Sequence, residues 1–221
     1  MPRFPVLALL LWSVFWGAAH SADFKFSEAD KEEQAQQKQE QADEQARIAG
    51  QLGTPCKNKI KNQKILVLFG ESQNGRVQAS QSNFNPYSDA INARLRALGL
   101  KTYTQAQIRQ QVAQAEIDAY FKNDPDAAIS ASKRMAAQYI LKGLITTEAG
   151  YNRAVNVNQV SIRMDFTLTG ANGKMISQAS AENASYAGHD TSGLALTLIN
   201  ERADALVASL YSDYCQRAGV R

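Results

Sequence analysis

The sequence VSIRMDFTLTGANGKMISQASAE, residues 160–182, carries the clearest structural signal in the chain. In its first ten residues, apolar and polar side chains alternate without interruption. The apolar positions are Val160, Ile162, Met164, Phe166 and Leu168. An alternation of period two is typical of a β-strand that buries one face and exposes the other. Residues 160–169 are therefore predicted to form a strand with one buried face.

An Asn172-Gly173 pair follows this strand and predicts a β-hairpin, because these residue types favour a tight two-residue turn. Such a turn fixes the pairing of the two strands. The expected opposite pairs are Leu168 with Ser177, Phe166 with Ala179, Met164 with Ala181, and Arg163 with Glu182. Large residues then face small ones, which leaves room for helices on the buried face. On the other face, Arg163 and Glu182 are expected to form a cross-strand ion pair.

Apolar runs and helix start signals organise the rest of the folded part. Further strands are expected at 64–69, 100–103 and 139–146, with Gly143 at a point of close approach by a neighbouring helix. Helices are expected to begin near Asn85, Thr104, Asp124 and Thr191 or Ser192. The predicted fold class is α/β (α+β): a mixed parallel and antiparallel sheet of four to five strands with helices packed on it.

Residues 1–21 are predicted to be a signal peptide. Arg3 precedes an apolar run from Phe4 to Ala19, and Ala19-His20-Ser21 places small residues at a cleavage site. An uncleaved anchor is the alternative, but a membrane span needs about 20 apolar residues. No cysteine follows the run at the position of a lipid attachment site, and no later stretch is expected to span a membrane. The protein is therefore expected to be exported to the periplasm.

The charge of the exported chain excludes one class of partner. Cleavage would remove one of 24 basic residues and none of the 21 acidic residues, which leaves 23 minus 21, a balance of +2. A field this weak does not favour nucleic acid or an anionic membrane surface as a partner.

The mature chain is expected to have two parts. Residues 22–55 are rich in Glu, Gln, Ala and Lys and are predicted to be a solvated helical spacer. Residues 56–221 are predicted to be a single α/β domain. Its ends carry Cys56 and Cys215, the two cysteines of the chain, and a disulfide between them would join both ends of the domain in an oxidising compartment. Two unpaired thiols are the alternative.

The loop from Gly70 to Asn85 contains the nearest approach to a catalytic motif. Its first eight residues, GESQNGRV, have the glycine spacing of a P-loop but lack the lysine and the following hydroxyl residue. Ser72 would need a base to act as a nucleophile, and His189 is better interpreted as an exposed loop residue. No group of residues has the spacing of a metal site. The sequence therefore predicts no catalytic residue, no cofactor and no metal.

Two polar loops are predicted to contact a partner, because long polar loops on a rigid sheet commonly carry function. The candidate contact residues are Gly70, Glu71, Gln73, Asn74 and Arg76 in the first loop, and Tyr151, Asn152 and Arg153 in a second loop at 151–158.

Residues 60–215 resemble a group of periplasmic domains in the order of their elements. The resemblance is carried by the strand KILVLFG, the helix end LRALGLKTY, the strand AAQYILKGLIT and the hairpin MDFTLTGANGKMIS. The group comprises domains of the curli secretion lipoprotein, the lipoprotein activators of penicillin-binding proteins, the amino-terminal domain of TolB and the middle domain of flagellar assembly protein T. The resemblance implies a binding platform without catalysis, and it transfers no site residue.

The function predicted from these features is that of a non-catalytic periplasmic accessory protein. It would bind one or more proteins of an envelope assembly, such as the secretion, flagellar or cell-wall machinery. Another class of function, a small-ligand or peptidoglycan-binding module that uses the 70–85 loop, is the alternative. An enzyme is the third hypothesis, and loss of activity in His189→Ala would support it.

Overall fold

The computed structural model describes residues 28–73, 76–187 and 191–217. The predicted signal peptide and two residues considered above, Asn74 and His189, lie outside these ranges.

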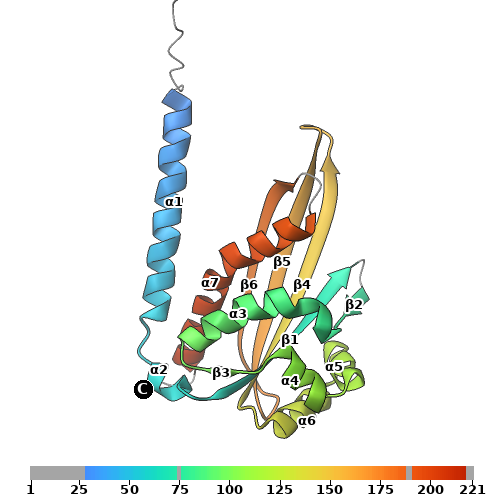
Figure 1. The fold of residues 1–221 in the computed structure, drawn as a ribbon. Coiled ribbons are helices and arrows are strands. Elements are labelled where there is room, and N and C mark those ends of the chain that lie inside the picture. Colours follow the sequence, from blue (N-terminus) through green and yellow to red (C-terminus); the bar gives the residue numbers. More distant parts are fainter. Residues whose placement is uncertain (1–27, 74–75, 188–190, 218–221) are drawn as a thin grey trace, which may run out of the picture. The chain divides into compact units, whose positions relative to one another are not determined.

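A six-stranded mixed sheet forms the centre of the fold (Figure 1). The strands are β1 (Lys64–Gln73), β2 (Arg76–Gln78), β3 (Lys101–Thr102), β4 (Tyr139–Asn152), β5 (Val157–Gly170) and β6 (Met175–Ala187). Their order is β2-β1-β4-β5-β6, and β3 also pairs with β1. β1 is parallel to β3 and β4, and the other pairs are antiparallel. The predicted fold class is confirmed; the sheet has six strands instead of four to five, because the polar segment 76–78 also pairs with β1.

Helices cover the two faces of the sheet unequally. They are α1 (Glu28–Leu52), α2 (Lys57–Ile60), α3 (Asn85–Ala97), α4 (Gln105–Gln111), α5 (Gln114–Phe121), α6 (Pro125–Met135) and α7 (Thr191–Arg217), with a 3-10 turn, η1, at Gln81–Phe84. α3 and α7 bury one face, which includes Phe69 and Phe166. α4, α5 and α6 bury the other face over β1 and β4, around Leu68 and Ile140. Most of that second face on β5 and β6 has no helix over it within the described residues.

The segment expected to be one helix from Thr104 forms two helices, α4 and α5. The start is as predicted: Gln107 N donates to Thr104 Oγ1 (3.2 Å), and Thr104 N donates to Gln107 Oε1 (2.9 Å). Val112 then takes an extended conformation, with φ −117° and ψ 122°, and α4 ends there. The break brings Val112 and Ile117 into the same core, with 3% and 1% of their surface exposed.

The hairpin between β5 and β6 has the predicted register through a different turn. Leu168 lies opposite Ser177, Phe166 opposite Ala179, Met164 opposite Ala181 and Arg163 opposite Glu182. However, Gly170 N donates to Lys174 O, so three residues rather than two separate the paired positions. The longer turn places Thr169 opposite Met175, and a bulge between this pair and the next restores the predicted pairing from Leu168 onwards. Gly173 has φ +77°, which explains the glycine in this turn.

Gly143 is closely approached by an aromatic ring, not by a helix as predicted. It lies in β4 opposite Phe166 of β5. A Cβ atom added at Gly143 would lie 2.5 Å from Cε1 of the Phe166 ring. The glycine therefore makes room for a core side chain from the neighbouring strand.

Replacing Gly143 with alanine is expected to lower the free energy of unfolding by about 1–3 kcal/mol, because Phe166 is buried and has no free space to move into. Urea denaturation measures this change. Gly150→Ala is the matched control, since a Cβ atom at Gly150 in the same strand meets nothing within 4 Å. The control should be neutral or slightly stabilising, and a similar loss in both variants would contradict the explanation.

The strands β4 and β5 are longer than predicted. The expected strand at 139–146 continues to Asn152, and β5 begins at Val157, so the expected loop at 151–158 is a tight turn between two paired strands. Asn152 lies opposite Val157, and the pairing runs without a shift to Tyr139 and Gly170. Figure 1 shows this hairpin projecting past the ends of α3 and α7.

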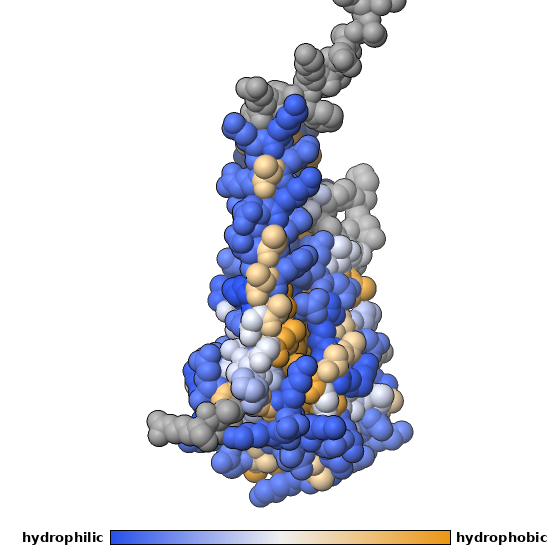
Figure 2. Space-filling view, turned by 90° about the vertical axis from the view of Figure 1, so that its left-hand side faces the viewer, coloured by the Kyte–Doolittle hydropathy of each residue, from blue (hydrophilic) through white to orange (hydrophobic). Residues whose placement is uncertain are grey.

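The chain divides into two compact units, Met1–Glu40 and Gln41–Arg221, and the division falls within α1. α1 is hydrophilic over most of its surface, with a thin line of weakly hydrophobic residues along it (Figure 2). Among the described residues, no helix has both the length and the apolar character that crossing a membrane requires.

Candidate functional site

Cys56 and Cys215 form a disulfide that joins the start of the sheet domain to the end of α7. Both cysteines are buried, with 3% and 1% of their surface exposed. Tyr211, one turn before Cys215, supports the same junction. Its hydroxyl accepts a hydrogen bond from Cys56 N (3.3 Å) and donates to the carbonyl of Thr54. This end of the molecule is therefore fixed covalently and by hydrogen bonds.

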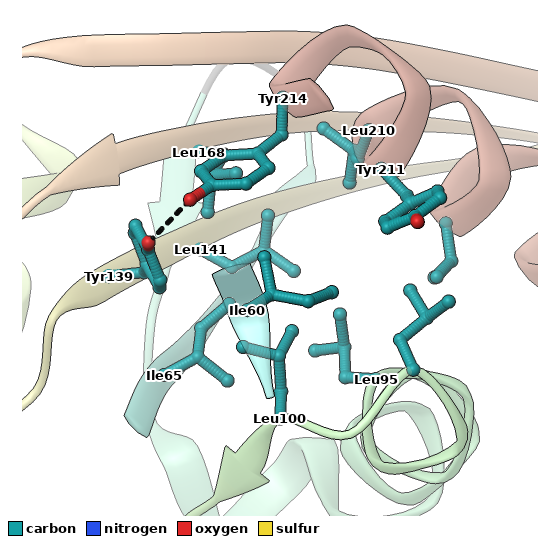
Figure 3. A pocket seen from close by; sticks show the side chains of 12 residues that line it. Ile60, Ile65, Leu95, Leu100, Tyr139, Leu141, Leu168, Leu210, Tyr211 and Tyr214 are labelled. Carbon is teal, nitrogen blue, oxygen red and sulfur yellow. Dashed lines mark hydrogen bonds between the residues drawn. The ribbon is translucent and has the colours of Figure 1, made fainter. Parts of the chain in front are cut away.

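A small apolar cavity lies between α3, α7 and the sheet near the disulfide (Figure 3). Its volume is about 30 Å³, and it is lined by aliphatic and tyrosine side chains. At its rim the hydroxyls of Tyr139 and Tyr214 are 2.8 Å apart and hydrogen-bonded. Burial, and then the hydrogen bond with Tyr214, raise the pKa of Tyr139. A cavity this small belongs to the packing of the core and offers no room for a substrate.

The predicted loop at 70–85 is largely ordered structure, and this corrects its interpretation. Gly70, Glu71 and Gln73 lie in β1, and Arg76 lies in β2. Gly70 is buried, and a Cβ atom there would lie 2.6 Å from the Phe121 ring. Gly70 therefore cannot contact a partner. Glu71 is half-buried and Arg76 is exposed, so these two stay candidates.

A shallow groove of about 340 Å³ runs between this segment and α5. Its lining residues are Val77, Gln78, Ala79, Ser80, Gln114, Asp118, Phe121 and Lys122. Gln114 lines the groove, and its Nε2 donates to Ala79 O (2.9 Å) and to Asp118 Oδ1 (2.8 Å). The predicted small-ligand alternative would place its ligand here, but the amide and carboxylate are already bonded to each other.

The end of the β4–β5 hairpin exposes a group of large apolar side chains. This group, the hairpin tip patch, consists of Tyr151, Val155, Val157 and Tyr186, with 57%, 55%, 38% and 61% of their surface exposed. The patch covers both faces of the tip: Tyr151 pairs with Asn158 on the face of Val160, whereas Val157 and Tyr186 lie on the opposite face. Tyr186 reaches it from β6, where it lies opposite Gln159 of β5. The Tyr151 hydroxyl donates to Asn156 Oδ1 across the turn, and Ala154 N donates to Asn152 Oδ1 (3.0 Å). The turn is thus held in one shape while its apolar side chains face solvent.

Two of the predicted contact residues lie beside this patch, and one belongs to it. Tyr151 is a member, Asn152 orders the turn and Arg153 is exposed within it. Val155 and Val157 lie within the loop predicted to contact a partner but were not named among its candidate residues, although their apolar character among the asparagines of VNVN was visible in the sequence. Tyr186 could not be placed there without the register of β6.

Below the patch, the uncovered face of β4, β5 and β6 forms a second exposed surface. It contains a hollow of about 390 Å³ lined by Thr146, Glu148, Ser161, Ile162, Arg163, Glu182, Asn183 and Ala184. Arg163 pairs with Asp165 (3.0 Å) and more distantly with Glu182 (3.8 Å). The predicted Arg163–Glu182 ion pair is therefore present, but Asp165 is the closer partner. The hydrogen bond that Arg163 donates to the Asp165 carboxylate raises the pKa of Arg163.

The carboxylates of α5 and of the start of α6 make contacts that stabilise the fold. Glu116 pairs with Arg134, Asp118 accepts a hydrogen bond from Gln114, and Asp124 caps α6 by accepting from Asp126 N (3.0 Å). Within the described residues, no group of three or more His, Cys, Asp or Glu side chains is placed to hold a metal ion.

No protein-family model matches the chain, and no curated protein does either. Solved structures do match. The lipoprotein GNA1162 from Neisseria meningitidis is 17% identical over 66% of this chain and 99% of its own, with a TM-score of 0.46.

Two other solved structures also match. PelC from Paraburkholderia phytofirmans, solved as a dodecamer, is 14% identical over 68% of this chain and 88% of its own, with a TM-score of 0.40. The C-terminal domain of LpoB from Salmonella enterica is 18% identical over 59% and 93%, with a TM-score of 0.36. LpoB is one of the lipoproteins that the sequence resembles; the resemblances to the curli secretion lipoprotein, TolB and flagellar assembly protein T stay predictions. Likenesses of this strength do not define a function.

Proposed function

We propose that the protein is an exported, non-catalytic accessory protein of the bacterial periplasm that binds another protein of the cell envelope. The observation that carries the proposal is the hairpin tip patch. Large apolar side chains that stay exposed on both faces of one ordered tip are typical of an element that binds a partner. The sequence of residues 1–21 supports export, and the Cys56–Cys215 disulfide suits an oxidising compartment.

The shape of the hairpin suits docking in particular. The two strands carry the patch beyond the helices, and the turn hydrogen bonds of Asn152 and Asn156 hold it in place. A preordered surface loses little conformational entropy on binding. Tyr151 and Tyr186 each provide a large, stiff contact area, and aromatic residues commonly dominate the binding energy of an interface.

The proposal predicts that the patch contacts the partner directly. A photoreactive phenylalanine analogue at position 151 is expected to form an adduct with an envelope protein in intact cells, and mass spectrometry identifies it. The same analogue at Lys101, an exposed position in β3, is the control and should give no such adduct.

The variant Tyr151→Ser should weaken binding to the identified protein at least about tenfold while changing the free energy of unfolding by less than about 0.5 kcal/mol, because the Tyr151 side chain is 57% exposed and its bond to Asn156 lies in an exposed turn. Equal adducts at positions 101 and 151, or unchanged affinity in Tyr151→Ser, would refute the tip as the docking surface.

A further inference from the structure

The outer strand β6 is long and poorly protected against pairing. It spans 13 residues and pairs with β5 on its inner side; no other described strand pairs with it. Glu182 is its single charged residue, and it contains no lysine or proline. Soluble proteins commonly use charges, prolines or short lengths to block such edges, since an open edge pairs readily with another chain. β6 therefore lacks the usual protection along its middle.

Two hydrogen bonds show which backbone groups of β6 point outward. Ala184 N donates to Asn183 Oδ1 (3.0 Å), and Ile176 O accepts from Arg217 Nη1 (3.0 Å), so neither group bonds to β5. In an antiparallel pair, successive residues direct their backbone groups alternately toward and away from the partner. The register with β5 is continuous from Ser177 to Ala187. The even-numbered residues therefore direct their N–H and C=O groups outward.

The open stretch of this edge is short and defined at both ends. At its ends, the carbonyl of Ile176 is hydrogen-bonded to the Arg217 side chain, and the amide of Ala184 is hydrogen-bonded to the Asn183 side chain. Between them lie Gln178, Ser180 and Glu182, which are exposed and direct their backbone groups outward. This stretch, residues 178–182, can pair with about five residues of an added strand, because every second residue of a strand directs its backbone groups to the same side.

Side chains at the edge indicate the chemistry of the added strand. The side chain of Glu182 is 79% exposed on the uncovered face, and Arg163 is 3.8 Å from it while pairing more closely with Asp165. A basic residue on the added strand would lie opposite Glu182 and complete this pairing. The neighbouring Ser180 and Ala184 are small and leave room for incoming side chains.

A second copy of the chain fits this edge less well. In an antiparallel pairing of two β6 strands about a two-fold axis at Ala181, each Glu182 lies opposite Ser180 of the other copy. No position of the strand between Met175 and Ala187 supplies a cation. Charge complementarity therefore favours a different protein over self-association.

We propose that the outer edge of β6 around Ser180 accepts an extended segment of a partner protein as an additional strand, with a lysine or arginine of that segment beside Glu182. This inference rests on the proposed function, because it supplies the mode by which the envelope partner binds. Main-chain hydrogen bonds would give affinity, and the pair with Glu182 would give register.

A fluorescent peptide with the β5 sequence, residues 157–170, is a suitable probe, because it already contains the alternation and the arginine that β6 pairs with. Fluorescence anisotropy with the full exported chain is expected to show binding. Ser180→Pro removes the outward amide and should weaken binding at least about tenfold, whereas Ser180→Ala keeps the backbone and should change affinity less than about twofold. Proline is tolerated on the outer side of an edge strand, and urea denaturation verifies that the variant is folded.

Charge exchange provides a second, independent readout. Glu182→Lys should weaken binding of the β5 peptide, and a peptide with Arg163→Glu should restore it. Absence of peptide binding to the wild type, or equal affinities of Ser180→Pro and Ser180→Ala, would overturn the inference. Sedimentation that shows a dimer dissociated by Ser180→Pro would also overturn it, since a second copy would then occupy the edge. If no adduct forms at position 151, the tip is not the docking surface. If Ser180→Pro captures the envelope partner as well as the wild type does, the edge alone is refuted.

Discussion

Replacing Gln81 with alanine is expected to lower the free energy of unfolding by about 3 kcal/mol, although this residue lies in a segment that looks like a polar loop. Gln81 is completely buried. Its Oε1 accepts a hydrogen bond from Phe69 N (3.1 Å), and its Nε2 donates to Phe69 O (2.7 Å) and Ala79 O (2.7 Å). Alanine would remove these three hydrogen bonds from buried backbone groups, and losing the partner of a buried polar group costs about 1–3 kcal/mol. Urea denaturation followed by circular dichroism measures the loss.

The position of Gln81 explains why the effect should be large. On its outer side, β1 pairs with β3 at residues 64–65 and with β2 at residues 71–73. Phe69 lies between these two short strands, and within the described residues no strand pairs with it on that side. The carboxamide of Gln81 presents an N–H and a C=O side by side to the backbone of Phe69, as a neighbouring strand would. It therefore completes the pairing of a central buried strand.

Two variants separate this explanation from a simple loss of packing. Gln81→Glu has nearly the same volume but cannot donate to the two carbonyls, and it would bury a charge, so it should destabilise at least as much as alanine. Gln178→Ala removes an exposed glutamine of β6 and should change stability by less than about 0.5 kcal/mol. Wild-type stability in Gln81→Glu would show that the hydrogen bonds of Gln81 are unimportant.

Much of the sheet could be predicted because the sequence pattern of 160–182 is set by burial. Val160, Met164 and Phe166 must face the helices, and a shift of one residue would expose all of them. This constraint explains why the predicted pairing was right although the predicted turn was wrong. The longer turn would misplace the strands by one residue, and the bulge at the start of β6 cancels that shift.

The candidate site was less predictable, because its residues are exposed and no core pattern constrains them. The end of β4, Tyr151 and Asn152, fell within the predicted loop at 151–158, yet backbone pairing with β5 orders it. The buried position of Gln81 left no signal either, since a glutamine beside serines and asparagines is typical of a loop. Both features depend on which backbone groups lack a partner, and only the three-dimensional pairing shows this.

Removing the disulfide with the double substitution Cys56→Ala and Cys215→Ala is expected to lower the free energy of unfolding by about 5 kcal/mol. The bond joins residues separated by 159 positions, so it restricts nearly the whole domain in the unfolded state. In the chain-entropy description, a closed loop of this length stabilises the folded state by about that amount. Small domains have total stabilities of about 5–15 kcal/mol. A measurable fraction of the variant molecules should therefore be unfolded even without denaturant.

The dependence on redox state tests the same bond without a change in sequence. Urea denaturation of the wild type in the presence of a reductant should approach that of the double variant, and the reductant should leave the double variant unchanged. Since both sulfurs are buried, reduction should follow unfolding and so require either denaturant or time. Equal stability of the oxidised wild type and the double variant would contradict this role. A loss near the expected size would make the fold depend on an oxidising compartment, which links the stability of the domain to its proposed export.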